Sequence, residues 1–294
     1  MAISTRAHSR KNNVFVFRTF LSTVFPNVLS SRPSSTAPVR VAKPKVLDVA
    51  GGKGDLAWLL SNVRGEGELN DVAVFVIDPQ QTNHSHLEKS VAYLVENKEE
   101  AALRSTPGTP HHQPLASLLP RLPPCPPFRS PAHIRMHLTD SVVRALVERN
   151  EEAFMATFEE ELSRPQPSNN RIKQSPEISR TVTSSSIAYK ALSSPSLIVG
   201  FHPDSATEPA VDFALALRIP FAVVVCCVFP SLFKSRLHRG RPVKTYEQFL
   251  AYLLAKDPRM RWEELAFANA SEETKRTVIY MTEEDFLETE REGG

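Results

Sequence analysis

The sequence predicts an α/β protein built on a doubly wound, mostly parallel sheet. Short apolar runs typical of buried strands alternate with segments of helical spacing. One apolar run, residues 46–49, breaks into three glycines within four positions, which is how a buried strand passes into a helix beneath a bound nucleotide. A chain of 294 residues, 41% hydrophobic and 23% charged, is also long and apolar enough to bury a full core.

The first half of the chain predicts one βαβ unit followed by less regular elements. A strand over 46–49 leads into a helix that begins at Leu56–Leu60, and a second strand over 72–77 stops at Asp78, because the proline after it disfavours helix. The elements expected next are a helix over 87–103, a third strand over 134–138 and one long helix over 141–162.

The second half continues the alternation and then reverses direction. The elements expected there are a strand over 197–201, a helix over 208–217, a strand over 221–225, a helix over 246–255 and a terminal antiparallel pair over 265–268 and 277–281. The acidic residues 282–294 are expected to form a frayed tail.

These elements indicate one domain, residues 46–281, with two insertions. Residues 105–133 hold nine prolines, and residues 163–186 are rich in Ser, Pro and Asn. Residues 1–45 form a basic extension, since residues 1–47 contain eight Lys or Arg and no acid, as transit peptides do. Dense apolar residues over 14–21 instead favour a helix that braces the domain. The expected location is intracellular, cytoplasmic or nuclear, with mitochondria as the alternative.

Composition excludes several classes of protein. Cys125 stands alone and Cys226 adjoins Cys227, so the spacing predicts neither a disulfide framework nor a Cys-x-x-Cys zinc site, and no metal is expected. No apolar run approaches the ~20 residues of a membrane helix, so no membrane partner is expected. A net charge of +2 neither requires nor excludes a polyanionic partner.

The glycine turn is compatible with two kinds of ligand. A phosphate-binding P-loop is excluded, because Lys53 precedes a glycine rather than Ser or Thr. A dinucleotide is possible, because residues 52–57 match Gly-x-Gly-x-x-Ala and Asp78 follows roughly 20 residues later. S-adenosylmethionine is favoured by Asp48, whose carboxylate would repel a pyrophosphate but attract a sulfonium and an ammonium group. Asp78 suits the ribose hydroxyls of either ligand.

Residues 46–54 together with Asp78 resemble the first two motifs of the class I, Rossmann-like S-adenosylmethionine-dependent methyltransferases. The terminal strand pair resembles the reversed hairpin that ends their seven-stranded sheet. The resemblance covers residues 46–78, 197–230 and 240–281. It implies that S-adenosylmethionine is held by the backbone of the glycine turn and by two acids, which are Gly51, Gly52, Gly54, Asp48 and Asp78.

A second group of candidate residues follows the fourth and fifth predicted strands. His202, Asp204 and Glu208 are candidates for the base, or for residues that orient the substrate, because the carboxyl ends of neighbouring parallel strands share one crevice. Cys226 and Cys227 are expected at the edge of the same crevice as substrate-binding residues.

His202, residues 206–208 and the cysteine pair resemble the His-x-Cys-Gly-x-Ala-Thr-Asp and Cys-Cys motifs of the tRNA ribose 2′-O-methyltransferases of the thirteen type. Pro203–Asp204 replaces the Cys-Gly step, Glu208 replaces Asp, and the zinc modules of those enzymes are missing.

A basic segment, residues 234–244, suggests the substrate class. It holds five Lys or Arg in eleven residues, and Arg236, Arg239 and Arg241 are expected to contact RNA phosphates. The expected activity is therefore methylation of RNA, with tRNA as one candidate. Two alternatives stay open: an NAD-dependent oxidoreductase that uses the same turn, and a non-catalytic methyltransferase-like binding protein.

Overall fold

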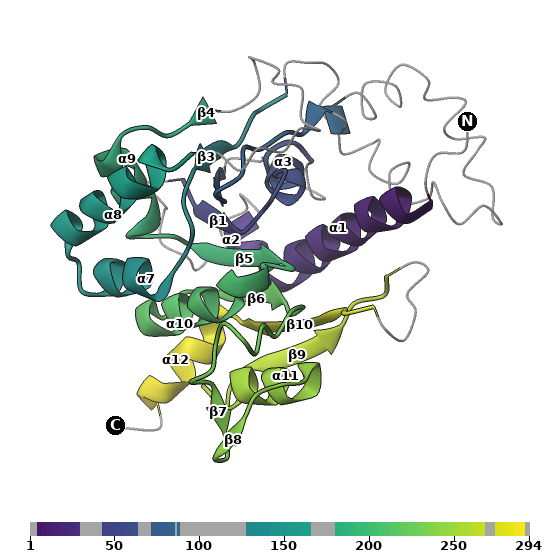
Figure 1. The fold of residues 1–294 in the computed structure, drawn as a ribbon. Helices are drawn as coiled ribbons and strands as arrows, with labels where there is room; N and C mark the ends of the chain where they lie inside the picture. The colour runs from purple at the N-terminus through teal and green to yellow at the C-terminus, as the bar shows by residue number, and fades with distance from the viewer. Residues whose placement is uncertain are drawn as a thin grey trace, which may run out of the picture.

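A computed structural model describes residues 5–29, 43–63, 72–85, 87–88, 128–165, 180–267 and 274–291. It shows an α/β fold in which helices cover both faces of an eight-stranded sheet (Figure 1). The predicted doubly wound, mostly parallel architecture is confirmed. The sheet has eight strands where the resemblance implied seven.

The strands of the main sheet are β1 (Lys45–Val49), β2 (Ala73–Ile77), β3 (Ala132–Ile134), β4 (Arg180–Thr181), β5 (Leu197–Phe201), β6 (Phe221–Val224), β9 (Arg261–Glu264) and β10 (Thr277–Met281). Their order is β4-β3-β2-β1-β5-β6-β10-β9. The strands from β4 to β6 run parallel, whereas β10 is antiparallel to both β6 and β9. The predicted reversed hairpin is therefore present.

Side-chain alternation along the strands sends apolar residues into two cores. In β1, Val46 packs with α1 (Thr5–Val24), α2 (Pro26–Leu29) and α3 (Asp55–Asn62). Leu47 and Val49 pack on the opposite side. That second core is covered by α7 (Asp140–Val147), α8 (Glu151–Ser163), α9 (Ser185–Leu192), α10 (Thr207–Leu217), α11 (Tyr246–Leu254) and α12 (Glu283–Arg291).

The helix expected over residues 14–21 lies within α1. Phe17 and Leu21 are fully buried against the first core, and the Arg18 guanidinium donates a hydrogen bond to the carbonyl of Val63 at the end of α3. In Figure 1, α1 runs alongside the sheet as a long purple helix. Within the described residues, no helix has both the length and the hydropathy to cross a membrane.

The predicted helix over 141–162 is wrong as a single element, because α7 and α8 are separate. Arg149 adopts a left-handed φ of 54°, which ends helical geometry. Asn150 then caps α8 by accepting a hydrogen bond from the amide of Ala153 at 3.0 Å. The apolar spacing continues across this break because both helices pack on the same core.

Both predicted insertions need corrected limits. Strand β3 spans residues 132–134 rather than 134–138, so the segment 105–133 ends inside a strand. The segment 163–186 contains β4 and the start of α9, neither of which the sequence predicted because both are short. Residues 89–103 of the helix expected over 87–103, and most of both insertions, lie outside the described residues.

The C-terminal region differs from prediction in two places. Strand β9 occupies residues 261–264 instead of 265–268. Its position could not be predicted from an apolar pattern, because all four of its side chains are exposed at the sheet edge. The acidic tail begins as α12 rather than as a frayed end. Phe286 is buried, and the carbonyls of Asp285 and Phe286 accept hydrogen bonds from Arg259 and Arg218 respectively.

Candidate functional site

The glycine turn follows β1, the strand at which the strand order of the sheet reverses. Strand β1 pairs with β2 on one side and with β5 on the other, so the chain returns to the opposite side of β1. In open α/β sheets, ligands bind outside the carboxyl ends of the strands at this switch point. The turn after β1 and the loop after β5 therefore border the expected crevice.

Each of the three positions in the turn differs in what a side chain there would meet. A Cβ atom at Gly51 would lie 2.6 Å from Oδ2 of Asp48, so the turn closes directly over that carboxyl group. Gly52 has a φ of +56°, and a Cβ there would meet nothing within 4 Å. Gly54 has a φ of +80° and precedes α3 at its N-cap. Open space therefore lies beside the backbone at Gly52.

Asp48 lies beneath the turn and is completely buried. Its Oδ2 accepts a hydrogen bond from the amide of Ala57 at 3.2 Å, whereas its Oδ1 has no hydrogen-bond partner. Burial raises the pKa of Asp48 to about 8, although the Ala57 bond opposes the shift; the charges of Asp78 and Asp55 raise it further. The carboxyl group is thus mostly protonated at neutral pH, which weakens the predicted repulsion of a pyrophosphate.

Asp78 connects the end of β2 to the turn. Its Oδ2 accepts a hydrogen bond from the amide of Gly52 at 2.8 Å, and its Oδ1 accepts one from the amide of Gln80 at 2.7 Å. Burial raises its pKa, and these two bonds oppose that rise. Asp78 is therefore part of the turn's own framework as well as a candidate acceptor for a ligand hydroxyl.

The loop after β5 contains two residues in unusual backbone conformations. His202 has a φ of 57° and Asp204 a φ of 50°, both in the left-handed region that L-residues rarely adopt. The amide of His202 donates to the carbonyl of Val224 at 3.2 Å, and its ring lies edge-on to Phe201 with the centroids 4.5 Å apart. A short 3₁₀ helix, η2 (Asp204–Ala206), then leads into α10. Strain of this kind clusters at functional sites.

Glu208 belongs to a network of ion pairs. Its carboxylate accepts hydrogen bonds from Arg236, from the hydroxyl of Tyr252, and from Nζ of Lys256 at 2.8 Å. Burial favours a higher pKa for Glu208, but the bonds from Lys256 and Tyr252 outweigh it, and the pKa is lowered. A low pKa and three donors make Glu208 a poor proton acceptor, contrary to the expectation for this residue.

Arg236 also differs from expectation, because it is buried rather than placed on an RNA-binding surface. Its guanidinium pairs with Glu208, donates to the carbonyl of Val228 at 2.8 Å, and lies 3.5 Å from the ring centroid of Phe233. It therefore fastens the loop after β6 to α10.

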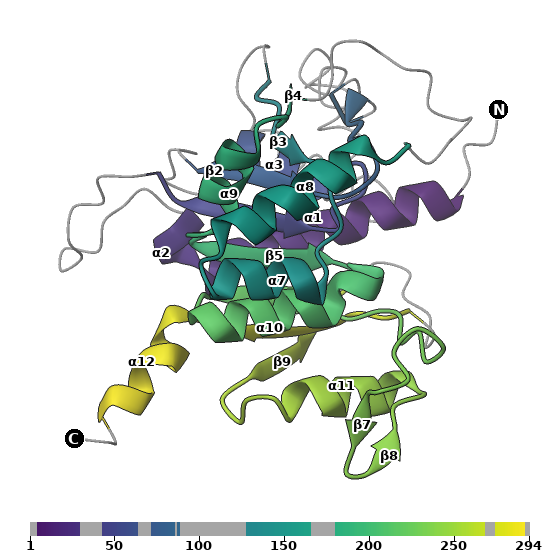
Figure 2. The ribbon, with the colours of Figure 1, turned by 60° about the vertical axis from the view of Figure 1, so that its left-hand side comes forward.

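Arg239 and Arg241 remain exposed on the small hairpin formed by β7 (Leu237–His238) and β8 (Arg241–Pro242). This hairpin extends from the body of the protein beside α11 (Figure 2). Of the three arginines expected to contact RNA, two are therefore exposed and one is buried.

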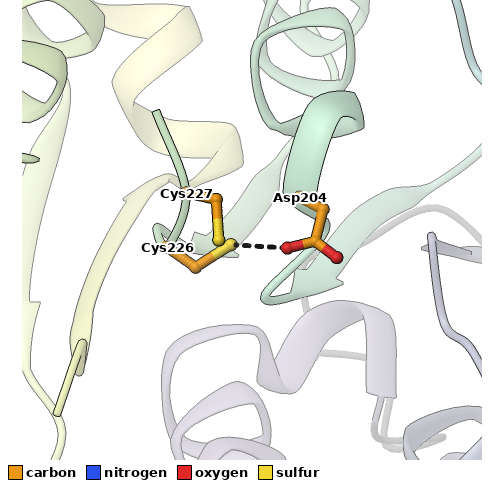
Figure 3. Close-up of side chains that lie close together, drawn as sticks. All are labelled: Asp204, Cys226 and Cys227. Carbon is orange, nitrogen blue, oxygen red and sulfur yellow. Dashed lines mark hydrogen bonds between the residues drawn. The ribbon is translucent and has the colours of Figure 1, made fainter. Parts of the chain in front are cut away.

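Cys226 and Cys227 follow β6 and meet Asp204 of the neighbouring loop (Figure 3). The thiol of Cys226 donates to Oδ1 of Asp204 at 3.5 Å. Cys226 is buried and Cys227 is exposed. The structure thus brings Asp204 and both cysteines together, as the shared crevice predicted, and places Glu208 and Arg236 in a separate cluster.

Sequence reasoning missed the loop that follows Asp78. The amide of Asn83 donates to the carbonyl of Lys53 at 2.9 Å, and Cγ2 of Thr82 lies 3.3 Å from the Cβ position of Gly54. Oγ1 of Thr82 is buried without a hydrogen-bond partner. The polar residues directly after a strand end were the available signal for this contact.

The chain matches no protein-family model, no curated protein and no solved structure. The geometry of its own residues therefore carries the functional proposal.

Proposed function

We infer that this protein is an S-adenosylmethionine-dependent methyltransferase. The observation that carries the proposal is the antiparallel strand β10, which lies between β6 and β9. In a dinucleotide-binding sheet the sixth strand continues beside the fifth in a single progression. The antiparallel strand β10 instead resembles the reversed hairpin of the class I methyltransferases. This is the same family whose first motif the glycine turn resembles.

The residues of the turn fit such a cofactor. The open space beside Gly52 allows a ligand to approach the backbone closely, and Asp78 lies next to it with lone pairs left for a ribose hydroxyl. Oδ1 of Asp48 is buried and has no hydrogen-bond partner, so it can donate a hydrogen bond to the ligand or to a water molecule while the carboxyl group is protonated, and accept one when it is ionised. The bound cofactor would supply a methyl group activated as part of a sulfonium.

The protein's own task is then to orient the acceptor and, where needed, to remove a proton. Methyl transfer depends chiefly on alignment of the acceptor atom with the methyl group. His202 and Asp204 lie on the loop that borders the same switch point, so they are the proposed orienting or proton-accepting residues. Glu208 is left out of this role because its carboxylate is already bound to three donors.

RNA is the proposed acceptor class. Arg239 and Arg241 are exposed on the β7–β8 hairpin, and Lys234 and Lys244 are exposed at its two flanks. The hairpin begins at Leu237, in the segment that follows β6 and the cysteine pair, so a phosphate backbone held there would lie near the loop after β6.

Calorimetric titration of the full chain with S-adenosylmethionine and with NAD tests the cofactor. Gly52→Asn is the sharpest variant, since Asn tolerates a positive φ but places a side chain in the open space. Gly240→Asn is its matched control, because Gly240 also has a positive φ and open surroundings but lies in the β7–β8 turn. We expect Gly52→Asn alone to abolish S-adenosylmethionine binding. NAD binding without a signal from S-adenosylmethionine would reject the proposal in favour of an oxidoreductase.

Transfer of a labelled methyl group tests catalysis separately. Incubation with RNA, protein and small-molecule fractions should label RNA, and His202→Ala should lower that labelling while leaving cofactor affinity intact. Cofactor binding without transfer to any fraction would identify a non-catalytic methyltransferase-like binding protein.

A further inference from the structure

The group formed by Asp204, Cys226 and Cys227 has the composition and spacing of a metal site. One carboxylate oxygen and two thiol sulfurs lie within 4.8 Å of one another. The cysteines directly follow β6, and Asp204 belongs to the loop after β5, so the two elements are held together by the strand pairing beneath them.

Adjacent cysteines rarely point the same way inside a strand, because successive side chains alternate between faces. Here β6 ends at Val224, before the cysteine pair begins. The chain is therefore free of strand geometry at this point, and both sulfurs turn toward Asp204 (Figure 3). The left-handed backbone of Asp204 brings its carboxylate to the same place.

The distances suit a tetrahedral ion. A thiolate sulfur at ~2.3 Å and a carboxylate oxygen at ~2.1 Å from one tetrahedral Zn²⁺ lie roughly 3.6 Å apart. Sγ of Cys226 and Oδ1 of Asp204 are 3.5 Å apart. The third ligand atom is Sγ of Cys227, which lies within 4.8 Å of the other two ligand atoms. It needs a shift of at most about one ångström to reach tetrahedral spacing, and a side-chain rotation at the exposed Cys227 can supply it.

We propose that Asp204, Cys226 and Cys227 bind a thiophilic divalent cation, with Zn²⁺ as the best match. Two sulfur ligands and one oxygen ligand favour zinc over magnesium or calcium, which prefer oxygen throughout. Three protein ligands leave the fourth tetrahedral position for water or a substrate atom. Asp204 and Cys227 are exposed, so an ion can reach the three ligand atoms from solvent.

This inference goes beyond the methyltransferase proposal and does not depend on it. The sequence predicted no metal because it lacks paired cysteines at zinc-finger spacing. The third ligand comes from a residue 22 positions before Cys226, and only the parallel pairing of β5 and β6 brings it close.

The test measures metal on the full chain purified under reducing conditions. Elemental analysis after equilibration with Zn²⁺ and removal of free ion should find one equivalent per chain. Replacement by Co²⁺ should give the visible absorption bands of a tetrahedral ion with a charge-transfer band from sulfur. Cys226→Ser and Cys227→Ser should each lose the charge-transfer intensity of one thiolate, and Asp204→Asn should weaken affinity tenfold or more.

Cys125→Ser is the control, since it removes the remaining cysteine of the chain and should leave both metal content and spectrum unchanged. Circular dichroism verifies that each variant folds. The proposal is overturned if no stoichiometric ion binds, or if binding survives the double replacement Cys226→Ser/Cys227→Ser. A mass lower by two hydrogens in Cys125→Ser isolated without reductant would also overturn it, because the two cysteines left in that variant would then form a disulfide with each other.

Discussion

Replacement of Asp48 by asparagine should stabilise the protein, by an amount that grows with pH. Asp48 is completely buried, and burial raises its pKa from 3.8 to about 8. Asparagine has the same shape, and its Oδ1 can still accept the hydrogen bond from the amide of Ala57. The variant therefore removes the titration and keeps the packing.

The direction follows from the two protonation equilibria of Asp48. Because its pKa is higher in the folded state, its contribution to stability is fully present below about pH 4 and is lost as pH rises toward 8. The full loss for a shift of this size is about 6 kcal/mol, at 1.36 kcal/mol per unit. Between about pH 5.5 and about pH 7.5 the free energy of unfolding of the variant should rise by about 2 to 3 kcal/mol relative to the wild type.

Urea unfolding of both proteins at several pH values measures this difference directly. Asp257→Asn is a useful comparison, because the hydrogen bond from Arg259 lowers the pKa of Asp257 below its ordinary value of 3.8. The stability that Asp257 contributes is fully present above about pH 4, so the difference between this variant and the wild type should stay constant between about pH 5.5 and about pH 7.5 and should shrink only in acid. A difference between Asp48→Asn and the wild type that stays constant across this pH range would refute the reasoning. If the variant is more stable but binds S-adenosylmethionine more weakly, the stability cost of Asp48 serves ligand binding.

Four further variants probe the glycine turn, the Glu208 network, the exposed hairpin and the cap of α11. Gly51→Ala should lower the free energy of unfolding by about 1–3 kcal/mol, because its Cβ would overlap Oδ2 of Asp48 at 2.6 Å. Arg236→Ala should cost about 1.5–3 kcal/mol by removing a charged hydrogen bond from the partly buried carboxylate of Glu208. Arg239→Ala should change stability by less than about 0.5 kcal/mol but reduce RNA affinity and its salt dependence. Thr245→Ala should cost about 1 kcal/mol, because Thr245 forms the capping box of α11.

Denaturant titration checks the stability changes, and filter binding to RNA at several salt concentrations checks the arginine. Gly51→Ala without loss of stability would show that Asp48 does not lie directly beneath the turn. Equal loss of RNA affinity in Arg236→Ala and Arg239→Ala, with both proteins equally stable, would contradict the buried position of Arg236.

The local sequence pattern was sufficient to predict the strands whose residues are buried. β1, β2, β5, β6 and β10 are apolar runs bounded by polar or turn residues, so their positions follow from the sequence. β9 lacks such a signal because all its residues are exposed at the edge. The break between α7 and α8 was missed because the apolar spacing hides a single residue with positive φ, Arg149.

The sequence by itself determined the central strands, the glycine turn and the carboxylates at the ends of β1 and β2, because these depend on neighbouring residues and on strand periodicity. The tertiary structure alone decided which distant polar groups meet. Glu208 pairs with Arg236, 28 residues away, and Asp204 meets Cys226, 22 residues away. Such contacts depend on how strands and loops pack in space. A local sequence pattern does not indicate which charged side chain pairs with a distant residue and which remains accessible to a ligand.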